Sequence, residues 1–271
     1  MRKILFVFIL MYSPLAFSQN DLANSYAQNG KTLVLGEKYP EAIESFNKAI
    51  AINPKSALVF YYRGLAKANL QDDLGAISDY NTSIKLDATN FEAFFNRGVS
   101  KYFLKDTENA IKDFDKSISL KSDFADSYLY RGYSYGDIQK YDEAIKDLNK
   151  GLLLNPKNGS GYINRAIVYI MTGKSKEAFD DAEKSILYNP GDIRGYNIRG
   201  QAKAIQKDYK GAIEDFTIVI NKNPDNVQAI FNRMAVKLNL EDKQGACSDY
   251  KMVKNLGEKT NVEMEEYCNK K

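Results

Sequence analysis

The stretch ADSYLYRGYSYGDIQKYDEAIKDLNKGLLLNPKN, residues 125–158, has the pattern of two amphipathic helices. Tyr128 and Tyr135 lie at helical spacing, and the apolar period resumes after a break at Gln139-Lys140. Pro156 ends the second segment, because proline has no amide hydrogen and a fixed φ. The stretch therefore predicts a helix, a short turn, a second helix and a stop.

This pattern recurs along the chain every 34 residues, without insertion or deletion. Two ladders of mostly small residues share the period, and small residues are needed wherever two helices approach closely. A repeated helix-turn-helix array is therefore predicted. The first ladder is Gly30, Gly64, Gly98, Gly132, Ala166, Gly200 and Met234, and the second is Ala42, Ala76, Ala110, Ala144, Ala178, Ala212 and Ala246.

With these ladders, the chain resembles the tetratricopeptide repeat family from Ala23 to Thr260. Pro54, Pro156, Pro190 and Pro224 match the family's closing proline, and Phe46, Tyr80, Phe114 and Phe216 match its late aromatic residue. Met234, Leu148, Ala182 and the absence of tryptophan depart from the family pattern. The resemblance implies an all-α fold, a right-handed α-solenoid of helix-turn-helix repeats.

The expected domain organisation follows the period. Residues 1–18 form a signal peptide, residues 19–260 carry seven repeats, and residues 261–271 form a C-terminal capping helix. The repeats are expected at 23–56, 57–90, 91–124, 125–158, 159–192, 193–226 and 227–260.

Charged residues recur within the array as well. Repeats two to seven each carry an arginine before the first-ladder position and an aspartate sixteen residues after that arginine, as in Arg131 and Asp147. The first repeat has Asn29 and Ser45 instead. The arginine and the aspartate occur together in six repeats and are both replaced in the first repeat. This pattern favours an ion pair that links the two helices of a repeat. The alternative is a row of arginines that binds anionic ligands.

The first eighteen residues have a different composition. Arg2-Lys3 precede the apolar run Ile4 to Tyr12, and the small-residue pattern Ala16-Phe17-Ser18 precedes Gln19. A charged start, a short apolar run and small residues are typical of a secretory signal peptide. We expect cleavage after Ser18, no membrane insertion of the mature chain, and a periplasmic or secreted protein.

The expected export of the protein affects how its two cysteines are interpreted. Cys247 lies in the second helix of the last repeat, and Cys268 lies in a terminal segment that opens with the capping-box pattern Thr260 to Glu263. In an oxidising compartment the two thiols are candidates for a disulfide that holds the capping helix, and two separate buried thiols are the alternative.

Enzyme chemistry is not indicated. The chain has no histidine, which removes the usual general base and the commonest metal ligand. Two cysteines cannot build a metal site by themselves. A net charge of +3, which becomes +1 without Arg2 and Lys3, does not favour nucleic-acid binding. We therefore expect no catalytic residue, no cofactor and no metal.

The family resemblance places the first helix of each repeat on the concave face. Apolar residues and asparagines on these helices form a stripe suited to an extended or helical polypeptide. An alternative is that these residues only pack against neighbouring repeats. The peptide-binding candidates are Leu58, Tyr61, Leu65, Phe95, Asn96, Val99, Tyr102, Leu129, Tyr133, Ile163, Asn164 and Ile167.

The sequence thus predicts a monomeric, non-catalytic scaffold that binds a protein or peptide on the concave face. A structural or self-assembling solenoid that makes contacts through its ends is the alternative. The identity of the partner cannot be read from the sequence.

Overall fold

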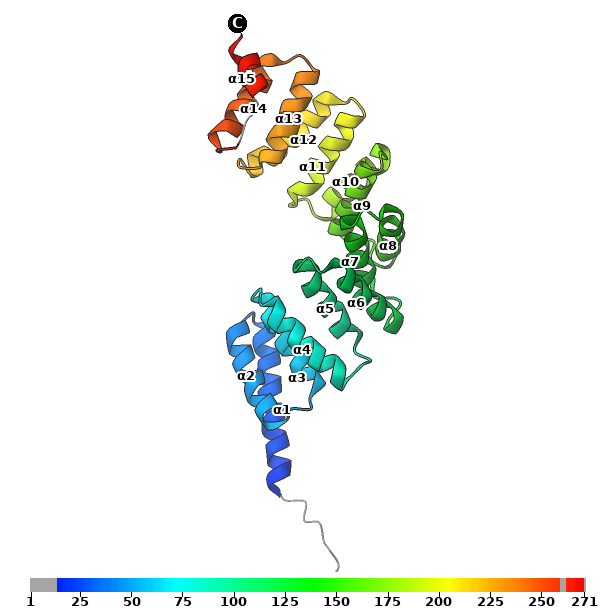
Figure 1. The fold of residues 1–271 in the computed structure, drawn as a ribbon, viewed down its shortest axis with the longest axis vertical. Coiled ribbons are helices and arrows are strands. Elements are labelled where there is room, and N and C mark those ends of the chain that lie inside the picture. The colour runs from blue at the N-terminus through cyan, green and yellow to red at the C-terminus, as the bar shows by residue number, and fades with distance from the viewer. Residues whose placement is uncertain (1–13, 259–261, 271) are drawn as a thin grey trace, which may run out of the picture. The chain divides into compact units, whose positions relative to one another are not determined.

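The computed structural model describes residues 14–258 and 262–270 and is helical, without a strand, over those residues (Figure 1). Most of the expected signal peptide and the residues Thr260-Asn261 lie outside the described residues. The helices divide between two compact units, an N-terminal unit up to Ser122 and a C-terminal unit from Asp123.

The N-terminal unit contains three antiparallel helix pairs. Each helix packs against the next one along the chain, and α1 packs on α2, α3 on α4 and α5 on α6 most extensively. The helices are α1 (Pro14–Leu35), α2 (Tyr39–Ile52), α3 (Ala57–Asn69), α4 (Asp73–Leu86), α5 (Phe91–Phe103) and α6 (Thr107–Leu120).

The C-terminal unit contains four further pairs and one terminal helix. Its helices are α7 (Ala125–Asp137), α8 (Tyr141–Leu154), α9 (Gly159–Met171), α10 (Ser175–Tyr188), α11 (Ile193–Ile205), α12 (Tyr209–Lys222), α13 (Val227–Asn239), α14 (Lys243–Asn255) and α15 (Val262–Asn269). From α3 to α13, each first helix begins 34 residues after the previous one, so the predicted period and all-α fold are confirmed.

The first ladder marks the point where the two helices of a pair cross. A Cβ atom at Gly64 would lie 2.7 Å from the ring of Tyr80, and one at Gly98 would lie 2.7 Å from the ring of Phe114. Such distances are below van der Waals contact, so glycine lets the aromatic ring lie directly on the backbone of the first helix.

Departures from the family pattern are compensated across the same crossing. Where Ala166 replaces glycine, the facing residue is Ala182 in place of an aromatic ring, and both side chains are buried in one cluster. At Gly132 the facing residue is Leu148, whose Cγ would lie 2.8 Å from an added Cβ. The larger Met234 packs in a cluster with Tyr250 and Ala246. At the first of these crossings the smaller Ala182 therefore accommodates the added methyl group of Ala166, whereas the other two crossings are packed without an opposite change in volume.

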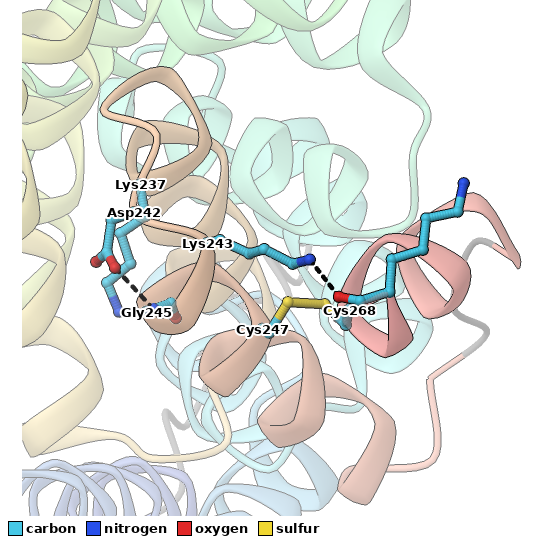
Figure 2. Close-up of a disulfide and its surroundings, with 7 residues drawn as sticks. Lys237, Asp242, Lys243, Gly245, Cys247 and Cys268 are labelled. Carbon is cyan, nitrogen blue, oxygen red and sulfur yellow. Dashed lines mark hydrogen bonds between the residues drawn. A yellow bond between two sulfur atoms is a disulfide. The ribbon is translucent and has the colours of Figure 1, made fainter.

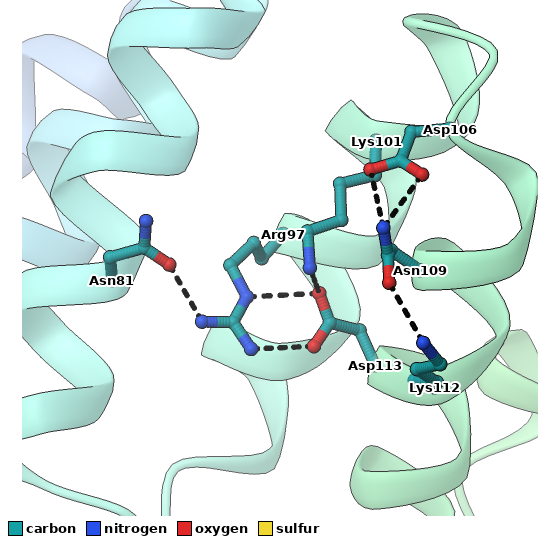
Figure 3. Close-up of polar contacts among 7 residues, drawn as sticks. All are labelled: Asn81, Arg97, Lys101, Asp106, Asn109, Lys112 and Asp113. Atoms are coloured by element: carbon teal, nitrogen blue, oxygen red, sulfur yellow. Dashed lines mark hydrogen bonds and ion pairs between the residues drawn. The ribbon is translucent and has the colours of Figure 1, made fainter.

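The ion pairs predicted from the sequence form in all six helix pairs concerned. Arg97 donates from Nε and Nη2 to the two carboxylate oxygens of Asp113, over 2.9 and 2.5 Å (Figure 3). Lys101 donates to the same carboxylate over 2.7 Å. The other pairs are Arg63–Asp79, Arg131–Asp147, Arg165–Asp181, Arg199–Asp215 and Arg233–Asp249.

The guanidinium groups also join neighbouring helix pairs. The Nη1 of Arg97 donates to the side chain of Asn81 on α4, 2.7 Å away, as Figure 3 shows. The equivalent acceptors are Asn47 for Arg63, Asn149 for Arg165, Glu183 for Arg199 and Thr217 for Arg233. Each arginine in these contacts binds within its own helix pair and to the pair before it, so the anion-binding alternative is not supported.

The first helix pair uses a neutral version of this contact. Asn29 donates from Nδ2 to the hydroxyl of Ser45 over 3.0 Å, and that hydroxyl donates to the carbonyl oxygen of Tyr26. The same two positions are therefore linked in the first pair without charge.

The turn inside each pair adopts a left-handed conformation at one residue. Gln71 has φ of 63°, its amide donates to the carbonyl of Ala68, and the amide of Asp72 donates to the carbonyl of Lys67. This closure satisfies carbonyl groups at the end of α3. The left-handed conformation favours glycine, and of the seven equivalent turn residues only Gly173 is a glycine. The other six are Glu37, Gln71, Lys105, Gln139, Lys207 and Glu241.

Helix α15 packs on the last helix pair. Met264 and Cys268 contact the cluster of Met234, Ala246 and Tyr250, so α15 covers apolar surface of α13 and α14. Cys247 and Cys268 form a disulfide between α14 and α15, with Cα atoms 5.5 Å apart (Figure 2). Tyr267 on α15 is exposed, with Lys243 over its ring.

Replacing Arg131 by Ala should lower the free energy of unfolding by about 3 kcal/mol, because the buried Asp147 carboxylate loses its bidentate partner. Urea denaturation measures the change. Lys140→Ala, at an exposed lysine, is the control and should have little effect. Equal stability of the two variants would contradict a structural role for the ion pair.

Candidate functional site

The first helices of neighbouring pairs border two cavities, one in each unit. The cavity of the N-terminal unit measures about 340 Å³ and lies among α3, α4 and α5. It is lined by Ala68, Gln71, Asp73, Tyr80, Asn96, Val99, Ser100 and Phe103. The cavity of the C-terminal unit measures about 410 Å³ and lies among α11, α12 and α13. It is lined by Gln201, Ala204, Ile205, Tyr209, Phe216, Gln228, Asn232, Ala235, Val236 and Asn239.

The two cavities occupy the same place in the repeat. Ala204 lies four 34-residue periods after Ala68, and Asn232 lies four periods after Asn96. The same backbone arrangement therefore produces a groove between successive first helices in both units. We call the cavity of each unit, together with the exposed first-helix residues of that unit at the repeat positions that line it, the first-helix groove of that unit.

Several predicted binding residues lie on or near this groove. Asn96 and Val99 line the N-terminal cavity directly. Leu58 and Ile167 are exposed on first helices, while Leu65, Phe95, Tyr102, Tyr133 and Asn164 are half-buried. The asparagine side chains also serve the fold, because Asn96 donates to the hydroxyl of Tyr61 and to the carbonyl of Glu92.

Three of the residues that were predicted to contact a partner are buried in the structure, which corrects their assignment to the binding surface. Leu129 and Ile163 each expose 1% of their surface and Tyr61 exposes 6%, so they offer little surface to a partner. The three share one repeat position. Tyr61 packs with Tyr80 and Ala93, and Leu129 packs with Leu148 and Tyr162, so these side chains are buried between their own helix pair and the next. Phe95 occupies the same repeat position and is only half-buried.

One repeat position on the groove is not among the residues predicted from the sequence. Phe103 and Ile205 each line a cavity, and Met171 is the equivalent residue on α9. Their exposed fractions are 61%, 52% and 65%. The signal was available, because each lies one helical turn after a position already assigned to the stripe, such as Val99 or Ile167.

Burial raises the pKa values of several tyrosine hydroxyls in this region above their ordinary value, at which they are already protonated near neutral pH. It raises the pKa of Tyr133 to about 12, and it raises the pKa values of Tyr61 and Tyr80 further. These groups therefore act as neutral hydrogen-bonding hydroxyls at physiological pH.

One charged residue of the first helices in the C-terminal unit has a partner within its own helix. Arg194 on α11 pairs with Asp192, the N-cap of its own helix, with 2.6 Å between Nη2 and Oδ2. This hydrogen bond raises the pKa of Arg194 and lowers the pKa of Asp192. Burial raises the pKa of the Asp126 carboxyl on α7.

Within residues 14–258 and 262–270, no three or more cysteine, aspartate, glutamate or histidine side chains are grouped to hold a metal ion.

A third cavity, of about 580 Å³, lies beside the disulfide. It is lined by Lys243, Gln244, Cys247, Ser248, Lys251, Cys268 and Lys270, which include three lysines.

Comparison with known families agrees with the repeat architecture. Residues 30–71 match a TPR repeat model, and residues 91–124 and 125–158 each match a tetratricopeptide repeat model. These stretches of the chain are therefore tetratricopeptide repeats, and the helix pairs that follow them continue the same period. No relative matches it in a comparison of its sequence with curated proteins.

Solved structures share this fold at low sequence identity. A tetratricopeptide repeat protein from Parabacteroides merdae is 21% identical, with a TM-score of 0.67 over 92% of this chain and 98% of the other. PilF of Pseudomonas aeruginosa is 16% identical, with a TM-score of 0.71 over 82% and 99%. YrrB, described as a TPR protein with an unusual peptide-binding site, is 18% identical, with a TM-score of 0.58 over 70% and 97%.

Replacing Tyr80 by Phe should raise the free energy of unfolding by about 1 kcal/mol. The Tyr80 hydroxyl is buried and has no hydrogen-bond partner in the structure, so the fold bears its desolvation cost. Phe114 and Phe216 occupy the equivalent positions, so the ring is accommodated without the hydroxyl. Urea denaturation of both proteins measures the change, with Phe216→Tyr as the reciprocal control. A less stable Tyr80→Phe protein would contradict this account.

Proposed function

We propose that this protein is a non-catalytic scaffold that binds a polypeptide in the first-helix groove. The observation that supports this most directly is the exposed apolar surface on the first helices of each unit, at Phe103 in the N-terminal unit and at Ile167, Met171 and Ile205 in the C-terminal unit. Large apolar side chains gathered along a groove mark interaction sites on soluble proteins. The polar neighbours Asn96 and Asn232 line the two cavities beside this surface.

Groove binding is favoured over assembly through the ends. Helix α15 covers apolar surface of the last helix pair, and the disulfide fixes it there. A covered end has less apolar surface for stacking with a second copy. The mature protein is therefore proposed to be a monomer, and light scattering at increasing concentration checks this.

We place the protein in the cell envelope or extracellular space. The charged and apolar start of the sequence supports export, and an oxidising compartment suits the Cys247–Cys268 disulfide. Among side chains from Gln19 onward within the described residues, the first buried one is Ala23, so cleavage after Ser18 leaves the packed part of α1 intact. No helix in the described part of the chain is long and apolar enough to cross a membrane.

The proposed domain organisation is a cleaved leader at 1–18, seven repeats within 19–260 and a capping segment at 261–271.

The exported protein should have lost residues 1–18 and should carry an oxidised Cys247–Cys268 pair. Intact-mass measurement before and after thiol alkylation under denaturing conditions tests both points, because only free thiols gain the label. Reduction should then allow two labels per chain. A labelled protein without reduction, or one that retains its first eighteen residues, would contradict the proposed compartment.

Changing Ile167 and Met171 together to Ser should weaken partner capture by at least about tenfold, equivalent to about 1.4 kcal/mol, because exposed apolar anchors are removed from α9. Capture from the envelope fraction, quantified by mass spectrometry, measures the effect.

The matched control changes Leu153 and Leu187 to Ser. These leucines expose 73% and 72% of their surface and lie on the second helices α8 and α10. Proteins captured by the unmodified chain and by this control, but lost from the Ile167/Met171 variant, would support the groove. Equal capture by all three proteins would contradict groove binding.

A further inference from the structure

The cavity of the N-terminal unit contains an unused polar group. Tyr80 lines this cavity, its side chain is fully buried, and its hydroxyl has no hydrogen-bond partner in the structure. Buried hydroxyls are nearly always satisfied, so an unsatisfied one beside a cavity points to a ligand that supplies the missing partner. The fold itself does not need this hydroxyl, because Phe114 and Phe216 take the equivalent positions.

The remaining polar groups of the cavity favour a hydrogen-bond donor as the ligand. Asp73 contributes a carboxylate, which only accepts hydrogen bonds when ionised. Asn96 uses its amide nitrogen for bonds to Tyr61 and Glu92, over 3.2 and 2.9 Å, which leaves its carbonyl oxygen as an acceptor. Two acceptors and one neutral hydroxyl therefore line the same cavity.

An exposed aromatic ring lies at the same cavity. Phe103 exposes 61% of its surface, and Val99 lies one turn before it on α5. The face of an aromatic ring attracts cations, and a guanidinium group can also stack on it. The lysines nearest in sequence are engaged: Lys67 binds Asp79 over 2.8 Å, and Lys101 binds Asp113 over 2.7 Å.

The equivalent cavity of the C-terminal unit lacks this chemistry. Tyr209 replaces Asp73, Phe216 replaces Tyr80, and Asn239 replaces Phe103. Asp73 is also the only carboxylate among the equivalent residues, which are Tyr39, Thr107, Tyr141, Ser175, Tyr209 and Lys243. The acidic, acceptor-rich character therefore belongs to one cavity and not to the repeat as such.

We propose that the cavity of the N-terminal unit binds an arginine side chain of the polypeptide partner. The guanidinium group donates to Asp73 and to the carbonyl oxygen of Asn96, and it reaches the hydroxyl of Tyr80, which is buried in the unbound structure, through a shift of the surrounding side chains. Its plane and its aliphatic stem pack on Phe103 and Val99. Arginine fits this set because it carries five donors in a planar group that also stacks on aromatic rings. The inference rests on the proposed function, since it names a side chain that the first-helix groove selects.

A peptide titration tests the specificity. The probes are N-acetylated, C-amidated pentapeptides with alanine at four positions and arginine, citrulline or lysine at the centre. Citrulline keeps the shape of arginine and removes its charge. Binding to the mature protein at low salt is followed by amide chemical shifts in two-dimensional NMR. We expect shifts confined to α3–α5 and an affinity for the arginine peptide at least roughly tenfold above that for citrulline.

Two substitutions test whether the arginine peptide binds in this cavity. Asp73→Asn and Tyr80→Phe should each lower the affinity for the arginine peptide, while Tyr80→Phe also makes the protein more stable. A gain in stability with a loss of binding cannot come from damage to the fold. Glu108→Gln, which removes an exposed carboxylate from the second helix α6, is the matched control and should bind the peptide unchanged.

Equal affinities for the arginine and citrulline peptides would overturn the proposal, as would unchanged binding in both cavity variants. Preference for the lysine peptide would also overturn the assignment to arginine. These results leave the proposed function separately testable, because the Ile167/Met171 variant concerns a different unit. Loss of partner capture in that variant, together with no preference for arginine here, would retain the scaffold and reject this specificity.

Discussion

The close crossing of the two helices in each pair is the contact on which the rest of the structure depends. Gly64 lets the ring of Tyr80 lie against the backbone of α3, and the neighbouring residues Arg63 and Asp79 form a bidentate ion pair at the same place. Packing and charge pairing therefore act at one crossing point. Packing fixes the separation of the helices, and the directional ion pair fixes how one helix is placed along the other.

The ion pairs also determine which charges remain for binding. A buried carboxylate is tolerated only when its hydrogen bonds are satisfied. Each aspartate of the six Arg–Asp pairs accepts two hydrogen bonds from its arginine. In four of the pairs a lysine adds a further contact to the aspartate, as Lys203 does to Asp215 over 2.8 Å. Much of the regularly repeated charge is consequently used inside the array. A carboxylate outside this system, such as Asp73, is then a distinguishing feature of the surface.

Repetition of the backbone gives equivalent cavities, and variation of single side chains gives each cavity its own chemistry. The positions of Asp73 and Tyr80 carry Tyr209 and Phe216 in the C-terminal unit. The hydroxyl group thus lies on a core residue of the second helix, Tyr80, in the N-terminal cavity and on the first residue of the second helix, Tyr209, in the C-terminal cavity. Such exchanges alter what a cavity can bind and leave the helix crossing unchanged, because the ring at the crossing is kept.

The sequence by itself determined the period, the helix pairs and the Arg–Asp partners, because these contacts recur at fixed separations and local geometry carries them. Burial along the first helices was decided by the tertiary structure. Leu129 and Tyr133 lie one turn apart on one face of α7, yet Leu129 packs on Leu148 and Tyr162 and is buried, while Tyr133 stays half-buried. Helical spacing cannot separate a side chain that faces the next pair from one that faces the groove, since both are apolar. The unsatisfied Tyr80 hydroxyl likewise required the packed structure, because only packing shows which polar atoms find no partner.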